Sequence, residues 1–210
     1  ESILKKRIKS LPDEAQDYAN KAYSHHNIVG NATKVPEQFT VGKASKEGGI
    51  QSLESLDNAL EHFASNAYDV LVTAPLDKQS VSEASNSTFT GQTGYIQSYA
   101  NAEDSLMMMV SDVMKIALVT EHLSLAQVPQ AITQELISRK TALLQQALVK
   151  DFNCATQKIA LLSLNPHSGD RGLLGSEEKD IIVPSIQSIK ATIPTVFGPY
   201  AADGFFGLHQ

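Results

Sequence analysis

Continuous apolar runs alternate with amphipathic stretches along this chain of 210 residues. The apolar runs predict strands buried on both faces, because they lack the polar alternation of a half-exposed strand. These strands are expected at residues 69–74, 106–110, 115–119, 158–164 and 192–197. Between them, apolar residues three or four positions apart predict amphipathic helices. These helices are expected at residues 50–67, 91–102, 125–150 and 176–190.

Strands that alternate with helices indicate an α/β fold, here a mostly parallel sheet with helices on both faces. Before the first of these strands, residues 1–27 have a helical pattern that Pro12 interrupts, and a short strand is expected near residues 38–41. The chain thus opens without a core strand and stops soon after one, so we expect part of a longer protein. We assign residues 1–90 to a first α/β domain that is incomplete at its N-terminus, and residues 91–210 to a second α/β domain.

The composition narrows the class of protein. A net charge of -6 argues against nucleic-acid binding, which usually needs a basic face. The compact basic run at residues 5–7 lies in an expected helix and fits a solvated face. No run reaches the ~18 apolar residues of a membrane span, and the charged N-terminus lacks a signal-peptide core. A single cysteine, Cys154, excludes an internal disulfide and fits a reducing compartment, so we expect a cytoplasmic enzyme or binding protein.

Two of the expected strands lead to a loop that carries a histidine. Residues 115–119 precede His122, and residues 158–164 precede His167. Open α/β sheets bind ligands beyond the carboxyl ends of their strands, and imidazole is the commonest metal ligand. The repeated position therefore suggests a metal or substrate site. A surface histidine and a plain strand-to-helix connector are the alternatives.

The loop around His167 is rich in glycine, which allows a backbone to approach a ligand closely. The glycines are Gly169, Gly172 and Gly175. The N-terminus of the helix that follows offers free N–H groups to an anion, and Glu177 and Glu178 suit its positive end. The loop matches neither the G-x-G-x-x-G dinucleotide pattern nor a P-loop.

Three further positions could contribute to a polar site. Lys78 follows the strand at residues 69–74 and could pair with a phosphate or carboxylate or act as a base, with an ordinary loop lysine as the alternative. Thr93 begins an expected helix, whose N–H groups and threonine hydroxyl could hold a phosphate or form a plain capping turn. Asp203 could be an acid/base or a turn residue.

In their order along the chain, these segments resemble one family, the NAD-dependent 4-hydroxythreonine-4-phosphate dehydrogenases of pyridoxal phosphate biosynthesis. The likeness runs from about residue 40 to residue 207. The matching segments are residues 69–78, 89–93, 116–125, 164–170 and 198–203. The most specific combination is an asparagine-proline-histidine loop with its glycines, which follows a strand end of the form threonine-x-histidine.

The resemblance implies a fold like that of isocitrate and isopropylmalate dehydrogenases, with two α/β/α domains, a cleft and a homodimer. It implies oxidation of 4-phosphohydroxy-L-threonine with NAD, followed by loss of CO2 to give 3-amino-2-oxopropyl phosphate, in the cytoplasm. A divalent metal would be held by two histidines of one subunit, which His122 and His167 match, and by a third from the partner. Zinc, cobalt, nickel, magnesium and manganese are the candidate metals. The second domain would then carry metal-binding and dimer-forming segments.

By the same resemblance, Asp203 and Lys78 match polar positions near the active site, where we expect catalytic roles, and Gln92 and Thr93 match the contact with the substrate phosphate. The family usually has histidine at position 92, and glutamine can donate a hydrogen bond but cannot titrate. A related dehydrogenase for another phosphorylated hydroxy acid, such as a phospho-threonate, is therefore an alternative. A catalytically silent fragment is another, because the family's opening strand, third metal histidine and much of the NAD pocket have no match in these residues.

Overall fold

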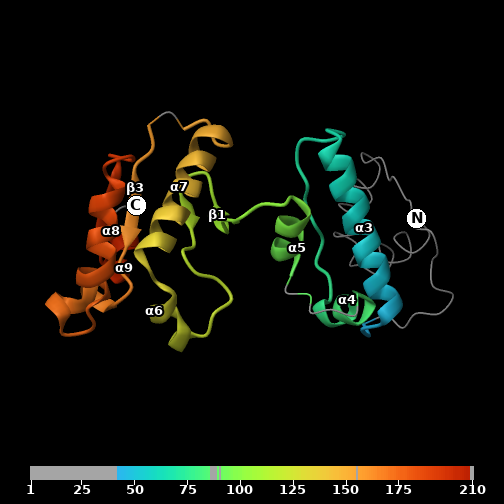
Figure 1. Cartoon of the computed structure of the whole chain (residues 1–210), viewed down its shortest axis with the longest axis horizontal. Helices are drawn as coiled ribbons and strands as arrows, with labels where there is room; N and C mark the ends of the chain where they lie inside the picture. Colours follow the sequence, from blue (N-terminus) through green and yellow to red (C-terminus); the bar gives the residue numbers. More distant parts are fainter. Residues whose placement is uncertain (1–41, 86–88, 90, 155, 209–210) are drawn as a thin grey trace, which may run out of the picture. The chain divides into compact units, whose positions relative to one another are not determined.

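The computed structural model describes residues 42–85, 89, 91–154 and 156–208, which belong to two compact units (Figure 1). The first unit is Glu1–Ala102 and the second is Glu103–Gln210, and each is described by itself. The helix expected in residues 1–27 and the strand expected near residues 38–41 lie outside the described residues. The domain boundary expected between residues 90 and 91 stays a prediction.

The helices described in the first unit are α3 (Lys46–Ala64), α4 (Lys78–Ser85) and α5 (Gln92–Tyr99). Ser45 caps the start of α3, because its side chain accepts a hydrogen bond from the N–H of Gly48. Leu56 and Leu60 are buried and lie four residues apart on one face of α3, as the apolar pattern predicts. The expected amphipathic helix at residues 50–67 is thereby confirmed, with a start four residues earlier than expected and an end three residues earlier.

Close contacts join the three helices described in the first unit. A Cβ atom on Gly49 of α3 would lie 2.0 Å from the backbone oxygen of Ser80 in α4, so a larger residue would push these helices apart. The carboxylate of Asp77 accepts hydrogen bonds from the Ser80 hydroxyl and N–H, and these bonds lower the pKa of Asp77. The hydroxyl of Tyr95 in α5 donates to Asp57 in α3 at 2.5 Å. Burial, together with this contact, raises the pKa of Tyr95 to about 12.

The strand expected at residues 69–74 is not formed. Residues 70–77 have no regular secondary structure, and Val70 and Val72 are 71% and 86% exposed. A strand forms only where a neighbouring strand satisfies its backbone hydrogen bonds, and none of the strands found among the described residues pairs with this segment. The apolar run predicts a burial that the described part of this unit does not provide, so the prediction is wrong here.

The strands described in the second unit are β1 (Met108–Val110), β2 (Lys115–Ala117), β3 (Ile159–Leu162) and β4 (Val196–Tyr200). The α-helices are α6 (Val128–Ala131), α7 (Gln134–Lys150), α8 (Val183–Ile189) and α9 (Ala202–Leu208). The short turns of other helical types are η1 (Leu125–Gln127), η2 (Pro166–Gly172) and the π-helical η3 (Glu178–Ile182). Among the described residues of the chain, no helix is both long enough and apolar enough to cross a membrane.

The long helix expected at residues 125–150 is divided into η1, α6 and α7. Pro129 lies in the first turn of α6, where its missing N–H is tolerated as predicted. The helix stops at Ile132, whose backbone is extended. Thr133 then caps α7, because its hydroxyl accepts a hydrogen bond from the N–H of Leu136 at 3.1 Å. A good N-cap inside the apolar pattern thus starts a second helix.

The described strands form two separate two-stranded sheets, in which β1 pairs with β2 antiparallel and β3 pairs with β4 parallel. The parallel pair shifts register where Gly198 approaches β3, because a Cβ on Gly198 would lie 2.4 Å from the backbone oxygen of Leu161. The presence of helices and of a parallel strand pair agrees with the predicted α/β class. The larger, mostly parallel sheet with helices on both faces and the likeness to isocitrate dehydrogenases stay predictions.

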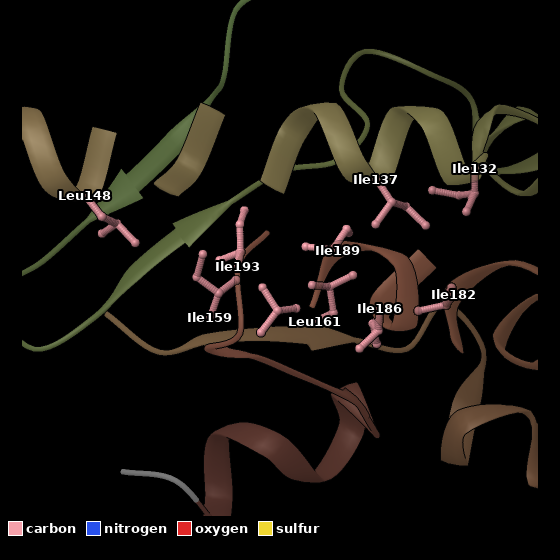
Figure 2. Close-up of a cluster of buried hydrophobic side chains, with 10 residues drawn as sticks. Ile132, Ile137, Leu148, Ile159, Leu161, Ile182, Ile186, Ile189 and Ile193 are labelled. Carbon is pink, nitrogen blue, oxygen red and sulfur yellow. The ribbon is translucent and has the colours of Figure 1, made fainter. Parts of the chain in front are cut away.

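An apolar cluster forms the core of the second unit (Figure 2). Its members are Ile132, Ile137, Leu148, Ile159, Leu161, Ile182, Ile186, Ile189, Ile193 and Val196. Figure 2 shows that the side chains of α7 point toward those of β3 and α8. Val196 is fully buried and Ile137 is 2% exposed. Because β3 runs through this cluster, the loop that follows β3 starts from a fixed position.

The segment before β1 is fixed to α7 by charge. Asp104 lies 2.6 Å from the Arg139 Nε and 2.8 Å from the Lys140 Nζ, and Lys140 also donates to the backbone oxygen of Ser105. Burial by itself would raise the pKa of Asp104, but the hydrogen bonds from Lys140 and Arg139 outweigh it and lower the pKa to about 2.

Candidate functional site

The loop after β3 holds His167 in a left-handed backbone conformation. Five successive residues, from His167 to Arg171, have φ angles between 42° and 76°. Only Gly169 among them is a glycine, and each other residue costs about 1–2 kcal/mol in this conformation. Strained backbone of this kind persists where the surrounding structure holds it in place. The loop is therefore more than a plain connector between β3 and the next helix.

The side chain of Glu178 holds the start of this loop. Glu178 is 5% exposed, and its Oε1 accepts hydrogen bonds from the backbone N–H groups of Leu164 at 2.8 Å and Asn165 at 2.7 Å. Its Oε2 accepts a third bond from the Asn165 side-chain amide at 2.9 Å. Burial would raise the pKa of Glu178, but these bonds outweigh burial and lower the pKa. A buried carboxylate with three N–H donors is thus kept in its charged form.

Two of the loop glycines are needed for packing within the loop. A Cβ atom on Gly169 would lie 2.8 Å from the Glu178 Oε2 and 2.9 Å from the Gly175 backbone oxygen. A Cβ atom on Gly175 would lie 2.5 Å from the Asn165 Nδ2. No other atom of the described residues comes within 4 Å of the Cβ position at Gly172. The close approaches at Gly169 and Gly175 are therefore to the protein itself, and an approach of this backbone to a ligand stays a prediction.

His167 and Asp203 lie close together because each follows the carboxyl end of one of the two parallel strands, β3 and β4. The His167 Nδ1 lies 2.6 Å from the Asp203 Oδ2, with side-chain exposures of 73% and 42%. Asp203 lies in the first turn of α9, which follows β4. The Ser163 hydroxyl joins the two segments, because it accepts a bond from the N–H of Ala202 and donates to the Asn165 carbonyl. With Nδ1 bound to Asp203, the Nε2 of His167 is the nitrogen that could bind a metal.

His122 lies in a less constrained environment. It follows β2 by five residues, has a φ of 56°, and exposes 64% of its side chain. Its Nδ1 is 3.5 Å from the Glu121 Oε2, which is long for a hydrogen bond. That oxygen is buried and has no hydrogen-bond partner in the part of the chain that the structure describes. Burial of a carboxylate oxygen without a hydrogen bond costs free energy, and a cation bound beside it would lower that cost.

The chemistry of these two histidines fits a divalent metal. His167 has a carboxylate within hydrogen-bond distance of Nδ1, which is the arrangement that orients metal-binding histidines in other proteins, and His122 has a carboxylate 3.5 Å from its Nδ1. Within residues 42–85, 89, 91–154 and 156–208, no group of three His, Cys, Asp or Glu side chains is arranged to hold a metal ion. That His122 and His167 bind one metal therefore stays a prediction.

The first unit brings Lys78 to the start of α5. The Lys78 Nζ lies 3.5 Å from the position that a Cβ atom would take on Gly91, the residue before α5. Gln92 is engaged with the preceding segment: its Nε2 donates to the Ala74 carbonyl at 2.9 Å, and its Oε1 accepts from the Thr73 hydroxyl at 2.7 Å. Thr93 is exposed in the same first turn. An ammonium group and free helix N–H groups at one place favour an anion.

The pattern of the sequence alone does not reveal a contact that shapes the site, the hydrogen bonds from Asn165 to Glu178. By its position, Glu178 is expected to be an acidic residue near a helix start, whereas its carboxylate accepts a hydrogen bond from Asn165, 13 residues earlier in the chain. The sequence feature that could have indicated this contact is the asparagine-proline pair before the histidine. Proline has a fixed φ and no N–H, so the asparagine must supply the N–H donors at this point.

Comparison with known proteins identifies the family. A family model described as "Pyridoxal phosphate biosynthetic protein PdxA" matches residues 1–210. The chain belongs to this family. A 4-hydroxythreonine-4-phosphate dehydrogenase from Bacteroides thetaiotaomicron is 37% identical over 190 residues, which are 90% of this chain and 52% of that protein. One from Colwellia psychrerythraea is 33% identical over 211 residues, 98% of this chain and 64% of the relative. The chain thus spans about half to two thirds of the length of these PdxA relatives.

Solved structures of PdxA relatives have the same fold. A 4-hydroxythreonine-4-phosphate dehydrogenase from Burkholderia phymatum matches with a TM-score of 0.68 and 26% identity, over 82% of this chain and 52% of that chain. One from Klebsiella pneumoniae matches with a TM-score of 0.75 and 24% identity, over the same shares of the two chains. The resemblance that the motifs indicated is confirmed, and so is the α/β class.

Proposed function

We propose that this chain is part of an NAD-dependent 4-hydroxythreonine-4-phosphate dehydrogenase. It would oxidise and decarboxylate 4-phosphohydroxy-L-threonine to 3-amino-2-oxopropyl phosphate, in vitamin B6 biosynthesis. PdxA family membership and the names of the curated relatives support this proposal. The observation that carries it is the His167–Asp203 pair, which joins the asparagine-proline-histidine loop to another of the matching family segments, residues 198–203.

The first unit supplies the groups suited to the substrate's phosphate. Lys78 contributes a positive charge beside the N-terminus of α5, and Thr93 contributes a hydroxyl and an N–H in the first turn. The α5 macrodipole adds to the attraction for an anion. Gln92 has a structural role, because its side chain forms hydrogen bonds that connect residues 73 and 74 to the start of α5. Lys78 could also move a proton if it lies next to the reacting atoms.

The second unit supplies the groups suited to a metal. His122 and His167 would hold zinc, cobalt, nickel, magnesium or manganese. Such a metal, when bound, would act as a Lewis acid on the oxygen atoms of the substrate. Asp203 accepts a hydrogen bond from the Nδ1–H of His167, which orients the ring and leaves Nε2 as the nitrogen that would hold the metal. An exposed carboxylate in this position can also take up or return a proton near the substrate hydroxyl.

The remaining parts of the proposal concern cofactor and partners. NAD is the expected hydride acceptor, and we assign no residue of this chain to its pocket. A homodimer with a shared active site is proposed from the PdxA family alone. The proposed cytoplasmic location is supported by the family and by the single cysteine, which fits a reducing compartment.

Gln92 favours a second candidate substrate. Both ends of its amide are bound within the first unit, and the amide cannot titrate as the histidine usual in the family can. A different phosphorylated hydroxy acid, such as a phospho-threonate, would suit a site that binds the phosphate through Lys78 and α5 and makes no use of an imidazole at position 92.

Formation of NADH by the complete enzyme of which this chain is proposed to be part tests both candidates. The assay offers NAD, a divalent metal and, in turn, 4-phosphohydroxy-L-threonine and phospho-threonate. Lys78→Met should raise KM for the preferred substrate by about tenfold or more, because a hydrogen bond to a charged group is lost. Lys43→Met, which alters an exposed lysine before α3, serves as the control and should leave KM unchanged. Absence of NADH with both substrates would contradict the proposal, and preference for phospho-threonate would select the second candidate.

A further inference from the structure

Glu178 is the buried charged group beside the candidate metal site that the proposed function does not use. Glu178 is 5% exposed, and three N–H donors bind its carboxylate. We propose that Glu178 is a positioning residue that sets the place of His167 through the backbone of the loop. This inference rests on the proposed metal site, since it concerns the imidazole expected to bind the metal.

Glu178 contacts the loop on both sides of His167. Before the histidine, its Oε1 holds the N–H groups of Leu164 and Asn165. After the histidine, its Oε2 lies 2.8 Å from the position of a Cβ atom on Gly169, so Gly169 packs directly on the carboxylate. Pro166 links Asn165 to His167 and has a nearly fixed φ. A shift of Asn165 must therefore move His167.

The two contacts explain how the left-handed run from His167 to Arg171 persists. The backbone within this run has one glycine to relieve it, and hydrogen bonds from Leu173 to Asp170 and from Leu174 to Gly169 close its far side. Glu178 closes its near side. If the carboxylate is removed, the two backbone N–H groups lose their acceptor and the run loses one of the contacts that hold it.

The helix start that carries Glu178 adds an independent observation. Glu178 opens η3, a π-helical turn that continues into α8. Single π-helical turns within α-helices occur often at functional sites. The neighbouring Glu177 provides a matched comparison, because its Oε2 accepts a hydrogen bond from the Asn165 side chain at 2.7 Å, whereas the Glu178 carboxylate also accepts the backbone N–H groups of Leu164 and Asn165.

The test compares Glu178→Ala and Glu178→Gln with the control Glu177→Gln in the full chain. Hydrogen exchange of the amides of residues 164–172 is measured without metal, and Co2+ affinity is measured by calorimetry. Glu178→Ala should speed exchange in this segment and weaken Co2+ binding by about tenfold or more. Glu178→Gln keeps one acceptor oxygen for the two backbone donors, so its Co2+ affinity should fall by about three- to tenfold. Glu177→Gln should change neither measurement.

The outcomes separate this inference from the proposed function. Exchange at the wild-type rate in both Glu178 variants would overturn the positioning role, whether or not the protein binds Co2+. If the unaltered chain binds no Co2+, the proposed metal site fails, and the exchange rates still decide whether Glu178 holds the loop. If Glu178→Ala does not fold, Glu178→Gln decides: faster exchange with an unchanged far-ultraviolet circular dichroism spectrum supports the role.

Discussion

The two histidine loops of the second unit have similar sequences before them but very different surroundings. His167 follows a strand that runs through the apolar core, pairs with Asp203 at 2.6 Å, and lies in a loop held by buried Glu178. His122 follows a strand with one antiparallel neighbour, is 64% exposed, and has a carboxylate at 3.5 Å. The comparison shows that the imidazole of His167 is already oriented by the protein, whereas the orientation of the His122 imidazole depends on what binds next to it.

The largest expected difference between the region of His167 and the region of His122 concerns the burial of apolar side chains. Ile159→Ala in β3 should lower the free energy of unfolding by about 2–5 kcal/mol, because Ile159 is 5% exposed within the core. Leu125→Ala, after His122, should lower it by less than about 0.5 kcal/mol, because Leu125 is 90% exposed. Urea unfolding measures the free energy of unfolding of both variants. An equal decrease in the two would contradict the account in which the apolar core supports the loop of His167 and not that of His122.

The next effect concerns the charged attachment of the segment before β1. Asp104→Asn should lower the free energy of unfolding by about 1–2 kcal/mol above pH 4, a value reduced for the half-exposed Arg139. The folded pKa of Asp104 lies below its unfolded value. Its contribution is therefore present above about pH 4 and is lost as the pH falls toward about 2.

Thermal melts across this pH range measure the attachment. The exposed Asp112 in the turn between β1 and β2 supplies the control, and Asp112→Asn should change stability by less than about 0.5 kcal/mol. An Asp104→Asn protein whose stability falls with acid as steeply as that of the unaltered chain would contradict the charged attachment.

The sequence alone was enough to predict those helices, strands and loops that depend on a local pattern of residues. The helices at residues 46–64 and 92–99, the strands before both histidines and the loop around His167 all follow from apolar spacing, caps and glycines. The strand at residues 69–74 could not be predicted correctly, because an apolar run forms a strand only with a neighbour. The break at Ile132 depends on a cap at Thr133 that competes with a continuous apolar stripe.

The candidate site was predictable in part for the same reason. His122, His167 and Asp203 stand out because of where they follow the expected strands. The His167–Asp203 contact joins residues 36 positions apart, and the role of Glu178 comes from a side chain that reaches back across a loop. Contacts of this kind depend on the packing of β3 against β4 and α8, which no local pattern specifies.

A smaller effect compares the two carboxylates beside the imidazoles. Asp203→Asn should weaken Co2+ binding by about tenfold, because it loses a charged hydrogen bond to the Nδ1 of His167. Glu121→Gln should weaken it less, because its oxygen lies 3.5 Å from the Nδ1 of His122. Calorimetric titration of both variants measures the difference, and a larger loss in Glu121→Gln would reverse the comparison of the two loops.

The most direct measurement is the metal content of the purified full chain, compared with His122→Ala and His167→Ala. Both histidines are expected to bind one divalent metal, so the unaltered protein should hold metal and each variant should lose most of it. The loss should be accompanied by an unchanged circular dichroism spectrum, since both side chains are exposed. Unchanged metal content in both variants would contradict the assignment of His122 and His167 as metal ligands.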